Sequence, residues 1–133
     1  MNGKWVADAN GWKFLKDNGE YATNSWGYIN GQWYFFDVQG NMVTGWYLVN
    51  NQWYYLNPAE GSLQGAMLTG WIMDSDYNGW FYLNASGAMV SGWNQISGKW
   101  YYMNPISDGT KGILSVNTYV DTYYVGADGA WIQ

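Results

Sequence analysis

Short runs of aromatic and aliphatic residues recur along the chain, separated by polar turn residues. The segment TGWYLVNNQWYYLN, Thr44 to Asn57, contains two such runs on either side of Asn50-Asn51. Asn and Gly tolerate the positive φ angles of tight hairpin turns, so the segment predicts a β-hairpin. Asn30-Gly31 and Ser97-Gly98 mark the same turn in two other segments.

The position of the turn determines which side chains share a face of each hairpin. With Asn50 and Asn51 in the turn, Trp46 lies opposite Tyr55 and Leu48 lies opposite Trp53. Opposed residues share a face and side chains alternate along a strand, so both tryptophans lie on one side. The equivalent sets are Trp5, Trp12 and Phe14; Trp26, Trp33 and Phe35; Trp71, Trp80 and Tyr82, around a four-residue loop Ser75 to Asn78; and Trp93, Trp100 and Tyr102. The opposite face holds Tyr34 and Phe36, Tyr54 and Leu56, Phe81 and Leu83, and Tyr101 and Met103.

The hairpins recur as repeats whose leading tryptophans lie 20 to 25 residues apart. A period of this length indicates a repeat array, and an isolated hairpin is marginal in water, so the repeats must stack on their neighbours. The sequence therefore predicts an all-β fold, a solenoid of stacked β-hairpins, as one repeat module over residues 1–133. We expect the repeats at about residues 4–24, 25–44, 45–69, 70–91 and 92–115, with a degenerate cap at 116–133.

The composition points to a binding protein with an unusually aromatic surface. Aromatic residues make up 21% of the chain, whereas charged residues supply 11%, against about 25% in a typical soluble domain. One small core cannot bury all 11 Trp and 13 Tyr. The net charge of −5, with five lysines and no arginine, argues against a surface for nucleic acid and favours a cationic ligand.

Several classes of chemistry are excluded by what the chain lacks. Without His or Cys it has no disulfide, no zinc motif and no histidine base. Asp74, Asp76, Asp108, Asp121 and Asp128 fall mostly in expected loops, where solvated turn residues are the simpler interpretation. We therefore predict no catalytic residues, no metal site and no cofactor. No apolar run suggests a membrane span, and the first residues lack the regions of a signal peptide, so an exported form would contain this chain as a segment.

The order Gly-Trp, Trp-Tyr-Tyr and Gly-x-Met resembles the choline-binding repeat family. Here it stands at Thr44-Gly45-Trp46, at Trp53 to Asn57 and at Gly65 to Trp71, and the resemblance extends from Trp5 to Tyr124. Repeats of that family anchor bacterial and phage murein hydrolases and some surface proteins to the cell wall. The resemblance implies a left-handed superhelix with choline between consecutive hairpins, held by two Trp of one repeat, one aromatic residue of the next and often a Met or Leu.

The resemblance implies five aromatic cages in this chain. A trimethylammonium group has no N–H to donate, so recognition relies on ring faces that attract the cation and on carbon surface that contacts its methyl groups. Ser115, directly before the cap, and Thr122 within it stand where a tryptophan pair would be expected, so the cap contributes one ring to its predecessor. The implied cages are Trp5, Trp12 and Phe35; Trp26, Trp33 and Tyr55; Trp46, Trp53 and Tyr82; Trp71, Trp80 and Tyr102; and Trp93, Trp100 and Tyr124, with Met42, Met67 and Met89 as further lining.

These expectations describe a secreted, non-catalytic module at the bacterial cell-wall surface. Its partner is choline or phosphorylcholine on teichoic and lipoteichoic acids, and in the parent protein the module is fused to a catalytic or surface domain. Two alternatives stay open. One is a repeat module for glucan or other oligosaccharides, because the same rings stack on sugars. The other is a structural solenoid that forms a homodimer through its terminal hairpin, a role in which Trp131 and the cap would take part.

Overall fold

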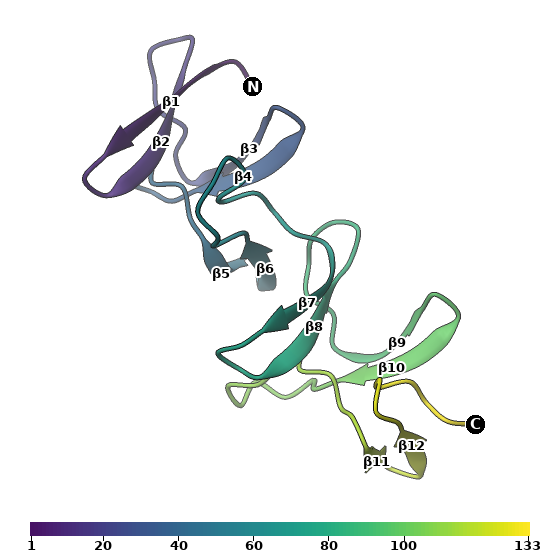
Figure 1. Ribbon diagram of the computed structural model, residues 1–133. Coiled ribbons are helices and arrows are strands. Elements are labelled where there is room, and N and C mark those ends of the chain that lie inside the picture. The colour runs from purple at the N-terminus through teal and green to yellow at the C-terminus, as the bar shows by residue number, and fades with distance from the viewer. The chain divides into compact units, whose positions relative to one another are not determined.

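The chain folds into six antiparallel β-hairpins, seen as six strand pairs in Figure 1, and contains no helix that could cross a membrane. The computed structural model describes all residues 1–133, in two compact units, unit 1 (Met1–Leu68) and unit 2 (Thr69–Gln133). This architecture confirms the predicted all-β fold of hairpins. Unit 1 contains β1 (Gly3–Asp8), β2 (Gly11–Lys16), β3 (Ser25–Ile29), β4 (Gln32–Phe36), β5 (Gly45–Val49) and β6 (Gln52–Leu56). Unit 2 contains β7 (Gly70–Asp74), β8 (Gly79–Leu83), β9 (Gly92–Ile96), β10 (Lys99–Met103), β11 (Thr118–Val120) and β12 (Tyr123–Val125).

The strand register of the tryptophan-bearing hairpins is the predicted one. Trp46 lies opposite Tyr55, and Trp71 lies opposite Tyr82 across the longer loop of the β7–β8 hairpin. Asn50 and Asn51 have φ angles of 50° and 65°, which a two-residue turn of this kind requires. The local turn chemistry thus sets the register of each hairpin.

The C-terminal segment also forms a hairpin, with three residues in each strand. Tyr119 of β11 lies opposite Tyr124 of β12, and Asp121 occupies the turn with a φ angle of 53°. Because neighbouring residues of a strand point to opposite faces, Tyr123 lies on the other face from Tyr124.

In four of the hairpins, a single residue after the second strand connects the hairpin to the one before it within the same unit. The residue forms an isolated β-bridge with its own hairpin, as Met42 does with Phe36. Its backbone N–H donates to the carbonyl oxygen of the second tryptophan of the preceding hairpin. Within the units these bonds are Met42 to Trp12 (2.8 Å), Met67 to Trp33 (2.8 Å), Leu114 to Trp80 (2.9 Å) and Trp131 to Trp100 (2.8 Å). We call this residue the linking residue.

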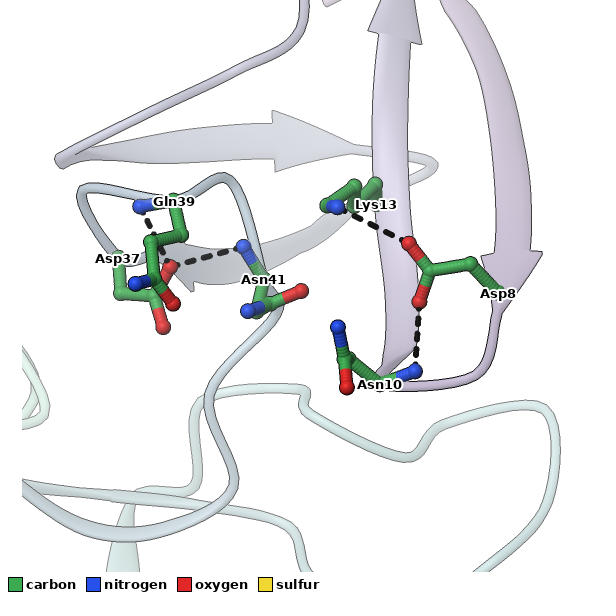
Figure 2. A network of polar contacts seen from close by, with 6 residues as sticks. All are labelled: Asp8, Asn10, Lys13, Asp37, Gln39 and Asn41. Atoms are coloured by element: carbon green, nitrogen blue, oxygen red, sulfur yellow. Dashed lines mark hydrogen bonds and ion pairs between the residues drawn. The ribbon is translucent and has the colours of Figure 1, made fainter.

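Side-chain hydrogen bonds shape the loop that leads to the linking residue. One carboxylate oxygen of Asp37 accepts from the backbone N–H groups of Gln39 (3.0 Å) and Asn41 (2.9 Å), as Figure 2 shows. Asn84 plays the same part in unit 2, accepting from Ser86 and Ala88. Asp and Asn favour such turns because their side chains bond to the backbone two residues on.

The core contains one large, fully buried side chain from each hairpin. Burying a side chain of this size contributes about 1.5–3 kcal/mol, so the hairpins are stabilised mainly through this inward position. The six residues are Phe14, Phe36, Leu56, Leu83, Met103 and Val125. The tryptophans are outside this set and remain available at the surface.

Candidate functional site

The second tryptophan of each hairpin pair is exposed to a similar degree. Its exposed fraction is between 37% and 43% in all five hairpins that carry a pair. The first tryptophan is half-buried in each case. Core packing alone does not require a large ring to stay this exposed at the same position of five hairpins. The residues are Trp12, Trp33, Trp53, Trp80 and Trp100.

The first tryptophan of a pair packs against a ring of the next hairpin. The ring centroids of Trp5 and Tyr34 lie 4.9 Å apart with an interplanar angle of 71°. The same near-perpendicular contact recurs between Trp26 and Tyr54 (4.9 Å, 70°), Trp71 and Tyr101 (5.0 Å, 71°), and Trp93 and Tyr123 (5.9 Å, 82°). We call these four places the first, second, fourth and fifth gaps. Each is therefore bounded by rings from two consecutive hairpins.

The third ring of each gap differs from the predicted one by a single position. The structure places Tyr34, Tyr54, Tyr101 and Tyr123 where the resemblance implied Phe35, Tyr55, Tyr102 and Tyr124. Those four residues contact other rings instead: Phe35 contacts Trp26 (5.1 Å), Tyr55 contacts Trp46 (4.8 Å), Tyr102 contacts Trp93 (5.1 Å) and Tyr124 contacts Tyr119 (4.9 Å).

The one-residue difference has a geometric cause. A gap is bounded by the tryptophan face of one hairpin and by the opposite face of the next, and adjacent residues of a strand point to opposite faces. The third ring must therefore be the residue directly after the second tryptophan, as Tyr54 is after Trp53. Alternation along the strand had already assigned Tyr54 to the face opposite the tryptophans, but it did not specify which face meets the preceding hairpin.

One predicted cage combines residues of both units. Trp46 and Trp53 belong to unit 1, and Tyr82 belongs to unit 2. Within its own unit, Trp46 contacts Tyr55 at 4.8 Å, and Tyr82 contacts Trp71 at 5.0 Å. The cage of Trp46, Trp53 and Tyr82 stays a prediction.

In the first gap the linking residue supplies a further wall, whereas Met67 and Met89 have other contacts. Met42 lines a pocket of about 200 Å³ together with Trp5, Trp12 and Tyr34. Met67 packs against the buried cluster of Phe35, Val43 and Leu56, as Trp26 also does. Met89 lies against Gly112, whose position leaves no room for a Cβ atom beside the Met89 sulfur.

Two linking residues were missed by the sequence analysis because they are not methionines. Leu114 and Trp131 occupy the same place after β10 and β12 that Met42 and Met67 occupy after β4 and β6. The signal that identifies them is a glycine two positions earlier, Gly112 and Gly129, both with positive φ. A pattern of Gly-x-apolar, rather than Gly-x-Met, would have found all of them.

The first and fifth gaps have different linings. In the first gap the centroids of Trp5 and Trp12 lie 6.5 Å apart at 87°, and residues of the loop after β6 add polar groups. Those loop residues are Gly61, Ser62 and Gln64. The fifth gap is a pocket of about 260 Å³ lined only by Trp93, Trp100, Tyr123 and Trp131. Volumes of this size suit a small headgroup rather than a drug-sized molecule.

Asp8 and Lys13 of the first hairpin form an ion pair, and the hydroxyl of Tyr34 is uncharged. The Lys13 ammonium and a carboxylate oxygen of Asp8 lie 2.9 Å apart, and the Asn10 N–H donates to the other oxygen of Asp8 (Figure 2). These bonds, Lys13 first, lower the pKa of Asp8. The Tyr34 hydroxyl is neutral at physiological pH, since its ordinary pKa is 10.0 and burial raises that pKa further. The ring faces are the main recognition elements that remain.

Two models of repeat families match the chain. The choline-binding repeat model matches residues 25–64, and the cell wall binding repeat model matches residues 69–89 and 91–105. No curated protein sequence gives a significant match.

Solved structures resemble almost the whole chain. Choline binding protein F from Streptococcus pneumoniae, crystallised in the presence of a tetrasaccharide-pentapeptide peptidoglycan analogue, is 37% identical with a TM-score of 0.69, over 99% of this chain and 47% of that one. CbpJ from Streptococcus pneumoniae TIGR4 is 35% identical with a TM-score of 0.70, over 98% and 48%. The modular autolysin LytC from Streptococcus pneumoniae, in complex with a synthetic peptidoglycan ligand, is 31% identical with a TM-score of 0.72, over 99% and 28%. The chain thus spans about half the length of the first two and a smaller part of the third.

Proposed function

The chain belongs to the choline-binding repeat family, and we propose that its gaps bind the choline headgroups of cell-wall teichoic or lipoteichoic acids. The observation that carries the proposal is the repeated corner made by two indoles of one hairpin and a tyrosine of the next. In three of the four gaps the contact between the first tryptophan and the tyrosine agrees to within 0.1 Å in centroid distance and 1° in interplanar angle. The second tryptophan of each of the four gaps stays 38% to 43% exposed, which core packing does not require.

The chemistry of the corners suits a quaternary ammonium ion. Its charge is attracted by the negative faces of aromatic rings, and its methyl groups gain contact with their carbon surface. A trimethylammonium group has no N–H, so an aromatic pocket does not need to supply a hydrogen-bond acceptor for it. The net charge of −5 adds a weak, salt-sensitive attraction for cations.

We propose four cages on the basis of the contacts within the units. They comprise Trp5, Trp12, Tyr34 and Met42; Trp26, Trp33, Tyr54 and Met67; Trp71, Trp80, Tyr101 and Leu114; and Trp93, Trp100, Tyr123 and Trp131. Trp46, Trp53 and Tyr82 are proposed as a further set. Each cage alone binds weakly, and several on one module give avidity toward a polymer that carries many headgroups.

The module is proposed to attach a larger protein to the cell wall. The repeats are binding units, and LytC, of which the chain spans 28%, is described as a modular autolysin. We propose that the parent protein is secreted and combines this module with a catalytic or surface domain. The repeats themselves then take no part in bond cleavage.

A choline titration tests the proposal directly. Intrinsic tryptophan fluorescence and the melting temperature are followed with choline, with glucose and glucan oligomers as parallel ligands. Saturation in the millimolar range with a raised melting temperature supports the proposal, because a ligand that binds only the folded state stabilises it. An unchanged melting temperature and fluorescence at saturating choline would refute it.

Binding of a sugar is the second candidate function, and the lining of the first gap is the observation that favours it. There Ser62 and Gln64 lie beside the rings of Trp5 and Trp12, a combination of stacking surface and polar groups that also suits a sugar. A response to glucan without a response to choline would support this function. No response to either ligand, together with a dimer in sedimentation experiments, would support the alternative of a structural solenoid that forms a homodimer.

A further inference from the structure

The fifth gap differs from the other three gaps at its linking residue. In all four gaps this residue donates its backbone N–H to the carbonyl oxygen of the second tryptophan. The side chain in this place is Met42, Met67 or Leu114 in three gaps and Trp131 in the fifth. The backbone bond is the same, so the difference between the gaps at this position is one of side-chain chemistry.

With the indole of Trp131, the lining of the fifth gap consists entirely of aromatic side chains. The centroid of this indole lies 5.4 Å from that of Tyr123 with an interplanar angle of 88°. Tyr123 is in turn nearly perpendicular to Trp93, at 82° and 5.9 Å. With Trp100 these residues form the whole lining of the pocket, and no carboxylate or ammonium group is among them.

The sixth hairpin makes this contribution unusual. β11 and β12 carry no tryptophan, so the hairpin has no pair of its own. It nevertheless brings two rings to its predecessor, Tyr123 from β12 and Trp131 from the segment that follows. The segment is held by the bridge between Val125 and Trp131 and by the bond to Trp100.

We infer that Trp131 is the specificity-determining residue of the fifth gap and makes it the tightest site in the chain for a fully methylated ammonium ion. This inference rests on the proposed choline-binding function. An indole face attracts a cation through its quadrupole, whereas the side chains of Leu and Met offer mainly dispersion. A fourth ring in place of leucine is expected to lower the Kd about 3- to 10-fold relative to the fourth gap.

The lining also predicts selectivity for the methylation state. A protonated dimethylamine carries one N–H that needs an acceptor, and a pocket walled by rings offers few acceptors for it. Burying this donor without a partner costs free energy that a trimethylammonium group avoids. Discrimination between choline and dimethylaminoethanol is therefore expected to be greater in the fifth gap than in the fourth.

The test is a titration that observes each gap separately. Tryptophan indole N–H signals of the ¹⁵N-labelled chain are assigned by single Trp→Phe variants and followed during addition of choline and of dimethylaminoethanol. Trp93 and Trp100 report the fifth gap, and Trp71 and Trp80 report the fourth. The variant Trp131→Leu introduces at this position the residue type found at Leu114, and Trp131→Phe retains a ring. Ile132→Val is the control beside Trp131, because Ile132 is 59% exposed and belongs to none of the cages.

The expected result is saturation of Trp93 and Trp100 at a lower choline concentration than Trp71 and Trp80. Trp131→Leu should remove this difference, Trp131→Phe should retain part of it, and Ile132→Val should leave it unchanged. If the indole signals of Trp71 and Trp80 in a Trp131 variant without choline match those of the natural chain, the variant is folded. Equal saturation of both gaps in the natural chain would overturn this inference alone, whereas no shift in any gap would overturn the proposed function itself.

Discussion

Trp26 and Tyr54 belong to different hairpins, yet their ring centroids lie 4.9 Å apart at an angle of 70°. Trp26 is simultaneously in contact with Phe35 of its own hairpin, at 5.1 Å and 73°. The half-buried indole is thus fixed from two sides by edge contacts, each worth about 0.5–1.5 kcal/mol beyond its buried area. A ring held in this way can present its face to a ligand with little further loss of conformational freedom.

Removing the exposed wall of the second gap should abolish its ligand site. Trp33→Ala deletes a ring that is 43% exposed, so we expect stability to fall by no more than about 1–2 kcal/mol while choline affinity in this gap falls at least about tenfold. Calorimetric stoichiometry measures the loss of one site. Tyr21→Ala is the control, because Tyr21 is equally exposed at 43% and lies outside the cages. An unchanged stoichiometry in Trp33→Ala would remove this gap from the proposal.

Tyr54 and Tyr55 should differ in their effect on the second gap. Tyr54→Leu removes the ring that contacts Trp26, and we expect choline affinity there to fall about 3- to 10-fold. Tyr55→Leu removes the ring that contacts Trp46, and the indole signals of Trp26 and Trp33 should titrate as before. If Tyr55→Leu weakened choline binding in the second gap more than Tyr54→Leu, the third ring would be Tyr55, as the family resemblance implied.

Gly65 should be intolerant of a side chain because of its neighbour as well as its backbone. A Cβ atom at Gly65 would collide with the Met42 side chain, and its φ angle is 86°. Gly19 has nearly the same φ, 88°, with nothing within 4 Å of the added atom. We expect Gly19→Ala to cost about 1–2 kcal/mol in urea unfolding and Gly65→Ala to cost more, with weaker binding in the first gap. Equal losses would show that Met42 simply moves aside.

Stability should fall at high pH partly through Tyr34. Burial raises the pKa of its hydroxyl, so the folded state keeps a proton that the unfolded chain releases near its ordinary pKa of 10.0. This contribution is fully present below that pH and is lost as pH rises through the folded pKa. The melting temperature of the natural chain should therefore fall relative to that of Tyr34→Phe as the pH rises above 10.0. A constant difference across this range would contradict the prediction.

Trp53→Ala tests the predicted cage of Trp46, Trp53 and Tyr82. Trp53 is 37% exposed, in the same range as the second tryptophans of the other hairpins. We expect one site fewer in calorimetry, while the indole signals of Trp5, Trp12, Trp93 and Trp100 titrate normally. If choline capacity stays the same, this assignment is wrong.

The sequence by itself determined the hairpins and their internal register. Alternation of side chains and turn pairs such as Asn50-Asn51 act within a few residues, so Trp46 opposite Tyr55 could be derived without a structure. The tryptophan pairs were recognised for the same reason, whereas Met42, Met67 and Met89 were indicated by the family resemblance. These features depend only on local backbone geometry.

Only the tertiary structure decided which rings meet across a gap. The choice between Tyr54 and Tyr55 depends on which face of a hairpin meets its predecessor, and no local pattern specifies that orientation. Stacking is directed by the bond from Met67 to the carbonyl of Trp33, between residues far apart in sequence, and the equivalent bond at Trp131 places a fourth ring in the fifth gap. Alternation of side chains is a property of one strand, whereas a binding cage is a property of two hairpins and the segment that joins them.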